Sequence, residues 1–322
     1  MTAPAKDAPE VDVPRVRRSE LGHVLRDTVR TTRGIVGLGL TGLVLLVAFG
    51  GPFVAPYDPE EYVTAPFAKP SALYHLGGDN LGRDVFSRLL CGGWQLIVMA
   101  AIATVIGVAL GAVAGIYAGY RRGLPDTVVM RAVDVLLAFP QIVFALLLVS
   151  VVGPRDWLLV VAVGLSHAPQ VARVLRASTL DVSERDFVKA VEITGVSTPR
   201  IMIGEILPNL VAPLMVEIGL RMTYSIVIMA GLSFIGFGLP PPQPNWGTMI
   251  NENRIGLTLN PWAALSPAIM IALLTIGLNT FTDAVTRVAL GVDRKEAALA
   301  VAGPSLVAPP AHVASTDTGA GS

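Results

Sequence analysis

Charged residues inside long apolar runs are the first chemically informative feature of this 322-residue chain. Asp134 follows Arg131 by three positions and Arg221 follows Glu217 by four, so each pair can share one helix face. A charge near the middle of a bilayer is unfavourable by about 3 kcal/mol on insertion scales. Each pair therefore either neutralises itself or lines a path for a charged solute. We favour self-neutralisation for Asp134 with Arg131 and leave both interpretations open for Glu217 with Arg221.

Ser166 and His167 come closest to a nucleophile with its base. Successive residues of a helix point about 100° apart, which places these two side chains poorly for proton transfer. The sequence has neither the H-E-x-x-H nor the G-x-S-x-G pattern of hydrolases. None of its lysines follows a glycine, so it also has no phosphate-binding G-K-[ST] loop. We expect no catalytic residue in this chain and no ATP hydrolysis by it.

Metal and redox chemistry find no support in the sequence either. Cys91 is the only cysteine, which excludes an intrachain disulfide and a cysteine-based metal cluster. The histidines are scattered along the chain, at His23, His75, His167 and His312. The formal net charge of +0 gives no reason to expect a nucleic-acid partner. We predict that the chain itself binds no metal and no cofactor.

The elements that must position these residues are membrane spans. Hydrophobic residues make up 52% of the chain and charged residues 15%. About 20 apolar residues cross the ~30 Å hydrocarbon layer, and several runs approach this length. The leader of the first run is too long for a signal peptide, so we interpret that run as an uncleaved span. We place spans at residues 35–55, 94–119, 127–151, 157–175, 211–237 and 263–287.

Basic residues orient these spans, because they concentrate on the cytoplasmic side of membrane proteins. With both termini inside, the Lys and Arg residues left outside are Lys69, Arg83, Arg88, Arg155 and Arg254, out of 24 in the chain. Omitting the fourth span would place the basic segment 173–209 outside, which argues for keeping that span. We predict an all-α polytopic protein with six transmembrane helices and cytoplasmic termini.

The chain divides into three parts on composition. Residues 1–33 form a cytoplasmic, mostly disordered N-terminal segment, because their first part is rich in Pro, Ala and charge. Residues 34–296 form the transmembrane domain. Residues 297–322 form a disordered C-terminal tail rich in Pro, Ala, Ser, Thr and Gly.

A polar segment at residues 183–209 separates the fourth and fifth spans. We expect Ser183 to cap a first helix, which Gly195 ends in the left-handed conformation. Thr198 then caps a second helix with Pro199 at its first position. The result is two short helices meeting at an angle, the second joined to the fifth span. A solvated connector and an element that transmits motion to a partner both fit this pattern.

Two features within the spans bear on packing and bending. A stripe of glycines recurs every four residues in the second span, at Gly107, Gly111, Gly115 and Gly119. Such a stripe lets helices approach closely, and we favour packing within the chain over a dimer contact. Phe139-Pro140 interrupts the third span, since proline removes a backbone hydrogen bond and kinks a helix. This bend either flanks a gated pathway or is a packing feature.

The polar segment resembles the coupling loop of ABC-importer permeases, whose pattern is E-A-A-x-x-x-G followed by I-x-L-P. The matching residues are Ala190, Gly195, Ile206, Leu207 and Pro208. Lys189 stands where the pattern has glutamate, and Val191 stands where it has the second alanine. The glycine and the Leu-Pro exit follow the pattern.

Four further stretches are similar to the dipeptide/oligopeptide/nickel group of these permeases. They are HLGGDNLGRDVFSRLL at 75–90, MRAVDVLLAFPQI at 130–142, GLSFIGFGLPPPQPNWGTMI at 231–250 and the segment 279–295. In the last stretch, Thr282 stands where the family pattern has glycine. The residues Val292-Asp293-Arg294 stand where the family usually has a sequence that contains proline. The resemblance covers about residues 30–296 in the motif order of the C-type subunit. It implies the type I ABC-importer permease fold in a bacterial cytoplasmic (inner) membrane.

The resemblance also implies partners and roles. The partners are a B-type permease, two cytoplasmic ATPase subunits that bind ATP and Mg, an extracytoplasmic solute-binding protein and membrane lipid. Coupling to the ATPases is expected at Phe187, Lys189, Ala190, Gly195 and Pro208. Docking of the binding protein is expected around Asp79, Arg83, Asp84 and Trp246. The candidates for the translocation path or its gate are Asp134, Phe139, Pro140, Glu217 and Arg221.

The sequence therefore favours a non-enzymatic permease subunit of an ATP-driven importer for short peptides. The same motifs serve nickel and other small solutes, and the binding protein sets much of the specificity, so these substrates stay open. An ion-coupled secondary transporter is the competing class, supported by the intramembrane charges but not by the capped polar segment.

Overall fold

The computed structural model describes residues 20–153, 155–238 and 242–289. These residues are predominantly helical, and two isolated β-bridges pair Tyr62 with Arg83 and Gly78 with Asp84 in the loop before the third helix. The disorder predicted for residues 1–19 and 297–322, and the end of the motif at 279–295, lie outside the described residues.

The helices follow the chain in the order α1 (Glu20–Thr28), α2 (Thr32–Gly50), α3 (Val85–Cys91), α4 (Trp94–Arg121), α5 (Gly123–Leu137), α6 (Gln141–Val152), α7 (Asp156–Ser183), α8 (Asp186–Ile193), α9 (Thr198–Ile201), α10 (Leu207–Asn209), α11 (Val211–Leu232), α12 (Trp246–Asn253) and α13 (Trp262–Ala289). Short 3-10 turns occupy Gly51–Phe53 and Arg254–Gly256. Short π-helical turns occupy Met202–Ile206 and Ser233–Phe237.

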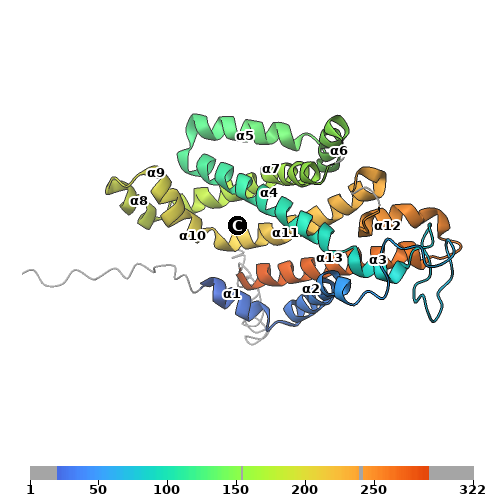
Figure 1. Cartoon of the computed structure of the whole chain (residues 1–322). Helices are drawn as coiled ribbons and strands as arrows, with labels where there is room; N and C mark the ends of the chain where they lie inside the picture. The colour runs from blue at the N-terminus through green and yellow to red at the C-terminus, as the bar shows by residue number, and fades with distance from the viewer. Residues whose placement is uncertain (1–19, 154, 239–241, 290–322) are drawn as a thin grey trace, which may run out of the picture.

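The long helices form a layered bundle (Figure 1). α4 and α7 pack side by side at its centre, with α5 on one side and α11 and α13 on the other. α2 packs along α13 at the far side. The short helices α8, α9 and α10 gather at one end of the bundle, and α3 and α12 gather at the opposite end.

The predicted all-α fold with membrane spans is confirmed. Among the residues that the structure describes, five helical segments are long and apolar enough to cross a membrane: Thr32–Phe53, Val85–Arg121, Asp156–Ser183, Val211–Phe237 and Trp262–Ala289. The bent pair Gly123–Leu137 and Gln141–Val152 makes a sixth when the pair is counted as one span. The third predicted span, 127–151, is therefore two helices joined at a break.

The break between α5 and α6 bends the chain by 82°. Proline has no N–H to donate, so the helical hydrogen bonds stop at Pro140. The turn before the proline is tighter than an α-helical turn, because the Phe139 N–H donates to the carbonyl of Leu136, three residues back, at 3.4 Å. Pro140 then stands before α6, with its carbonyl accepting from the Phe144 N–H at 3.0 Å. The interruption predicted at Phe139-Pro140 is thus present as a sharp bend.

The glycine stripe of α4 packs against the backbone of α7. A Cβ atom added to Gly107 would lie 2.7 Å from the Gly164 carbonyl oxygen, and one added to Gly111 would lie 2.6 Å from the Ala168 carbonyl oxygen. Gly115 and Gly119 meet the carbonyls of the next two turns in the same way. The prediction that this stripe packs within the chain is confirmed, and any larger side chain would separate the two helices.

Two helices extend into or beyond segments for which the sequence predicts otherwise. Within the segment 1–33, predicted to be mostly disordered, residues 20–28 form α1, which packs against α13, and residues 1–19 lie outside the described residues. The fourth span was placed at 157–175, but α7 runs to Ser183 with Pro169 inside it. Its polar second half stays helical because it continues to pack on α4, where Thr179 is fully buried beside Gly119.

Replacing Gly111 with leucine tests the α4–α7 contact. The Gly111→Leu side chain has no space against Ala168 and Val171, and overpacking of this kind lowers the free energy of unfolding by about 1–3 kcal/mol. We expect a lower thermal unfolding midpoint in detergent for Gly111→Leu. The matched control is Gly39→Leu on α2, where an added Cβ has no neighbour within 4 Å. Equal midpoints for the two variants would contradict the packing role.

Candidate functional site

The polar segment at 183–209 projects from one end of the bundle as α8, a turn and a second helical run (Figure 1). Gly195 separates the two with a φ of +75°, the left-handed conformation predicted for it. The second run passes through α9, the π-helical turn and α10 into α11. Pro208 lies exposed within α10, next to the start of α11.

The caps of these helices differ from the prediction. Ser183 is the last residue of α7, and its hydroxyl donates to the Leu180 carbonyl at 3.0 Å, so it cannot cap α8. The residue before α8 is Arg185, which makes no capping bond through its side chain. Ser197 precedes α9, so Thr198 is the first helical residue and Pro199 the second. The prediction failed because α7 extends further than its apolar run.

An apolar cluster fixes α8 to the end of the bundle. Val188 of α8 is fully buried beside Val182 of α7 and Ile116 of α4, with Phe187 partly buried at its edge. Arg122 reinforces this junction by donating to the Ser183 hydroxyl and the Glu184 carboxylate, both at 3.1 Å. α8 is therefore attached to the ends of the two helices that the glycine stripe joins.

The opposite face of α8 is open. Lys189 and Ala190 are exposed, and Ile193 is 87% exposed. An exposed isoleucine at the end of a short helix, on the face that does not pack against the bundle, is a candidate contact for another protein. Of the predicted coupling residues, Phe187 faces the bundle, Lys189 and Ala190 face away from it, and Gly195 sets the angle between the two helices.

The two intramembrane charge pairs differ in structure. Glu217 and Arg221 pair with each other as predicted, with 3.0 Å between Oε2 and Nε, and both are buried. The predicted pairing of Asp134 with Arg131 is wrong. Asp134 instead accepts from Arg173 of α7 at 2.8 Å, because α5 lies against α7. A second such pair joins Asp126 to Arg176.

A network of polar side chains extends from Glu217 and Arg221 across the membrane helices. Arg221 donates to the Gln170 side chain at 2.7 Å, and the same oxygen accepts from Gln141 at 2.7 Å. The Gln141 amide nitrogen also donates to the Ser166 carbonyl at 3.1 Å. α6, α7 and α11 are thus connected through amide and guanidinium groups.

The network continues on the other side of α7. His167 is fully buried, with its Nδ1 3.3 Å from the Gln141 amide and its Nε2 3.0 Å from the Ser225 hydroxyl. Ser225 lies 3.1 Å from the Thr104 hydroxyl of α4. Ser166 donates to the Val163 carbonyl and not to His167, which agrees with the expectation that the two form no nucleophile–base pair.

Sequence reasoning missed Gln141 and Gln170 as members of this membrane network. The available signal was their polarity, because each interrupts an apolar run next to a proline, in AFPQI and HAPQV. Polar residues at membrane depth need hydrogen-bond partners, and both glutamines find theirs on other helices.

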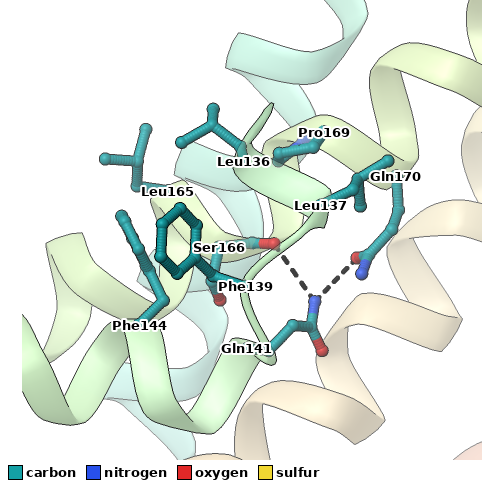
Figure 2. Close-up of a pocket in the computed structure, with 9 residues that line it drawn as sticks. All are labelled: Leu136, Leu137, Phe139, Gln141, Phe144, Leu165, Ser166, Pro169 and Gln170. Carbon is teal, nitrogen blue, oxygen red and sulfur yellow. Dashed lines mark hydrogen bonds between the residues drawn. The ribbon is translucent and has the colours of Figure 1, made fainter. Parts of the chain in front are cut away.

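An open hollow of about 320 Å³ lies beside the bend, between α5, α6 and α7. Figure 2 shows Gln141 at its edge, with its amide directed to Ser166 and Gln170. The apolar part of the lining comes from Leu136, Leu137, Phe139, Phe144, Leu165 and Pro169. The exposed Phe139, one of the predicted gate residues, is thus part of the wall of a space beneath the bend.

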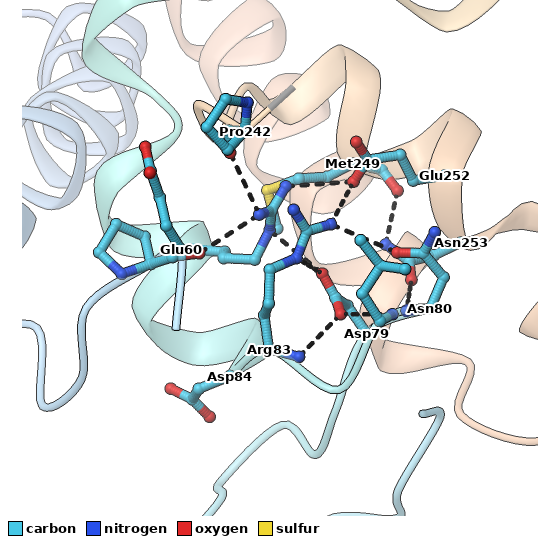
Figure 3. Close-up of polar contacts among 12 residues, drawn as sticks. Glu60, Asp79, Asn80, Arg83, Asp84, Pro242, Met249, Glu252 and Asn253 are labelled. Atoms are coloured by element: carbon cyan, nitrogen blue, oxygen red, sulfur yellow. Dashed lines mark hydrogen bonds and ion pairs between the residues drawn. The ribbon is translucent and has the colours of Figure 1, made fainter. Parts of the chain in front are cut away.

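The end of the bundle opposite α8 contains a buried ion cluster (Figure 3). Arg83 contacts Asp79 at 2.6 Å and Glu252 of α12 at 3.0 Å. Arg88 of α3 contacts Glu252 at 3.1 Å and Asp79 at 3.4 Å. The backbone N–H of Asn80 also donates a hydrogen bond to the side-chain oxygen of Asn253 at 2.9 Å. The cluster ties the loop before α3 to α12, far apart in the sequence.

The four residues predicted for docking belong to this interior. Asp84 caps α3, accepting from the Ser87 N–H at 2.8 Å. Trp246 is fully buried, and its indole N–H donates to the Leu89 carbonyl at 2.8 Å. Asp79 is 0% exposed and Arg83 2%. These side chains shape the outer end of the bundle from within, so a docking partner would touch the residues around them.

Comparison with known proteins gives consistent results. The family described as "Binding-protein-dependent transport system inner membrane component" matches residues 111–289. The glutathione transport system permease protein GsiD of Pectobacterium atrosepticum is 34% identical over 261 residues, covering 80% of this chain and 85% of that protein. GsiD of Escherichia coli is 36% identical over 243 residues, covering 75% and 80%. The MetNI methionine ABC transporter in an inward-facing form aligns with 15% identity and a TM-score of 0.48, covering 61% of this chain and 93% of that one.

The chain belongs to this inner membrane component family. The resemblance drawn from the motifs is therefore confirmed, and with it the multi-pass location in the inner membrane. The protein is a permease subunit of an ABC importer.

Replacing Arg88 tests the outer ion cluster of this permease. Arg88→Leu leaves Asp79 and Glu252 with one arginine in place of two, and breaking a buried ion pair lowers the free energy of unfolding by about 3–5 kcal/mol. We expect a large drop in the thermal unfolding midpoint in detergent. Arg254→Leu, at an exposed arginine just after α12, is the matched control and should leave the midpoint nearly unchanged. A small effect of Arg88→Leu would show that the cluster is dispensable.

Proposed function

We propose that this permease translocates short peptides and is driven by separate ATPase subunits through α8. The observation that carries the proposal is the junction of α8 with α4 and α7, on a chain whose similar proteins include glutathione permeases. Glutathione is a tripeptide, so short peptides are the substrate class best supported. Nickel chelates and other small solutes are the alternative within the same group.

The proposed coupling element is α8 with the turn at Gly195. Its open face, with Lys189, Ala190 and Ile193, is available to an ATPase subunit, while Val188 on the other face is packed into the bundle. A displacement of α8 by the ATPase would therefore act on the end of α7, which α8 contacts, and on α4 through the apolar cluster that they share. Pro208 adds a second route, because the helical run that contains it leads into α11.

The energy source in this proposal is ATP bound with Mg by the partner subunits. The sequence of the permease has no phosphate-binding loop, which supports assigning hydrolysis to separate chains. A paired B-type permease would supply the second half of the pathway. An extracytoplasmic binding protein would dock near the outer ends of α3 and α12, over the ion cluster that keeps this end in shape.

The translocation path is proposed to pass near the bend and the membrane network. Phe139 and Pro140 form the bend, Asp134 lies on the adjoining turn of α5, and Glu217 with Arg221 lies at the far end of the network. Glu217 and Arg221 neutralise each other and are both buried, so the pair places no net charge beside the proposed path of a zwitterionic peptide. This property suits a solute that carries both an amino and a carboxyl terminus.

Reconstitution of the permease with its partner permease, ATPases and binding protein in liposomes tests the substrate class. We expect ATP-dependent uptake of labelled glutathione and other short peptides, with no uptake driven by a proton gradient alone. Free amino acids and nickel serve as competitor controls. Uptake by the single chain under a proton gradient would favour a secondary transporter. Nickel uptake without peptide uptake would show that the substrates are nickel chelates and not short peptides.

Replacing Gly195 tests the coupling assignment. A β-branched residue is strained at a φ of +75°, so Gly195→Val should change the angle between α8 and α9. We expect uptake to be lost while the permease stays in the membrane at normal levels. Gly195→Asn should retain uptake, since asparagine tolerates the left-handed region. Gly204→Val is the matched control, because this exposed glycine of the same segment has no neighbour within 4 Å and no positive φ. Normal uptake by Gly195→Val would defeat the coupling role.

A further inference from the structure

One turn of α7, from Ser166 to Gln170, collects polar contacts from two other helices, α6 and α11, and α11 in turn contacts α4. Gln141 reaches it from the start of α6, Arg221 and Ser225 reach it from α11, and Thr104 of α4 lies behind Ser225. This turn of α7 also contains Pro169. It is the point at which the membrane network crosses the centre of the bundle.

Gln141 is the member of this network that belongs to the bend. It is the first residue of α6, immediately after Pro140, and its amide nitrogen lies 2.7 Å from the Gln170 oxygen and 3.1 Å from the Ser166 carbonyl. A primary amide nitrogen has two hydrogens to donate, and the three polar atoms near it, which are the Gln170 oxygen, the Ser166 carbonyl and the His167 Nδ1 at 3.3 Å, all belong to α7. Figure 2 shows the side chain crossing from the bend to α7 in this way.

α7 connects this contact to the coupling end of the protein. The helix is continuous from Asp156 to Ser183, and the glycine stripe keeps α4 close along most of its length. α5 packs on the same helix below the bend, and two ion pairs, Asp126 with Arg176 and Asp134 with Arg173, join the two helices there. A displacement of α8 therefore moves α4, α7 and α5 together, and Gln141 decides whether the start of α6 follows.

We propose that Gln141 is a positioning residue that holds the α5–α6 bend to α7, so that movement of the coupling segment is carried to the bend. The proposal rests on the proposed coupling function and assigns to Gln141 a role that the family motifs do not define. Its bonds to Ser166 and Gln170 make α6 move with α7 as one unit. Without these hydrogen bonds, α7 moves relative to the bend.

The hollow beside the bend explains why a polar contact is needed here. The open hollow between α5, α6 and α7 leaves the first turn of α6 without full apolar packing, whereas Ala145 and Val149 further along α6 are fully buried. An unfilled junction resists relative movement poorly, because dispersion contacts are lost across a gap. Directional hydrogen bonds at Gln141 supply the missing restraint, and Arg221 on the far side of Gln170 holds that acceptor in place.

The functional test compares Gln141→Met with Gln95→Met in the reconstituted transporter. Methionine keeps the length of the side chain and removes its donors, and Gln95, partly buried in α4, has no hydrogen bond among those found in the described residues. We expect uptake per ATP hydrolysed to fall about tenfold in Gln141→Met, which corresponds to the loss of two ordinary hydrogen bonds. Hydrolysis itself should match that of Gln95→Met, and both variants should be present in the assembled transporter at equal levels. An unchanged ratio of uptake to hydrolysis in Gln141→Met would overturn the proposal.

A structural test uses spin labels at two exposed positions, Val151 on α6 and Val174 on α7, in a Cys91→Ala background. In the assembled transporter, the distance between the labels should stay constant between nucleotide-free and ATP-bound states, because α6 moves with α7. A change of several ångströms would overturn the proposal. In the chain alone, Gln141→Met should broaden the distance distribution relative to Gln95→Met, and identical distributions would also overturn it.

These experiments distinguish a failure of the proposed transport function from a failure of the role assigned to Gln141. If the unaltered transporter shows no ATP-driven uptake, the proposed function fails, while the distance measurement in the chain alone still decides whether Gln141 holds the bend. If uptake is ATP-driven and the variant keeps its full uptake per ATP, only the assignment of Gln141 fails.

Discussion

The close packing of α4 on α7 is the contact on which the rest of the structure depends. Four glycines recur at the spacing of one helical turn, and the backbone carbonyls they meet on α7 recur at the same spacing. In a membrane no hydrophobic driving force brings helices together, so close van der Waals contact has to supply the association. Glycine allows this because it removes the side chain that would separate the two backbones. α5, α8 and α11 are all placed by reference to this pair.

The same packing explains how a short polar helix at one end can act on a bend near the membrane centre. A glycine-packed pair behaves as one body, because there are no flexible side chains between its backbones to absorb displacement. α8 is attached to one end of this body through Val188, and the membrane network surrounds a turn further along it. Coupling over this distance therefore needs no chain of side-chain rearrangements. It needs a rigid pair of helices and a firm contact at each end.

The sequence was sufficient for features that depend on local chemistry. Span lengths follow from bilayer thickness, the bend follows from Pro140, and the left-handed turn follows from Gly195. The pairing of Glu217 with Arg221 follows from their spacing on one helix. Each of these depends on residues within about one turn of each other.

Features that depend on which helices are neighbours could not be predicted from the sequence in the same way. Asp134 has a suitable partner on its own helix, yet it pairs with Arg173, because α5 lies against α7. Asp79 and Arg83 look like exposed loop residues until α12 brings Glu252 over them. Gln141 has no role in the sequence pattern, since its partners are on α7. The end of α7 was misplaced for a related reason: contact with α4, and not hydrophobicity, keeps its last turns helical.

The ion pairs at one end of the bundle are buried and those toward the other end are exposed. This difference indicates which end can move. At the outer end, Arg83 and Arg88 are buried with their carboxylates, where removing one partner would leave a charge out of water. At the other end, Arg122 with Glu184 and Arg173 with Asp134 are largely exposed, and such pairs contribute about 0–1 kcal/mol each. Exposed pairs can exchange partners or water with little change in free energy, whereas the buried cluster cannot. The exposed ion pairs toward the α8 end therefore offer little resistance to a displacement that enters through α8, while the outer end keeps its shape.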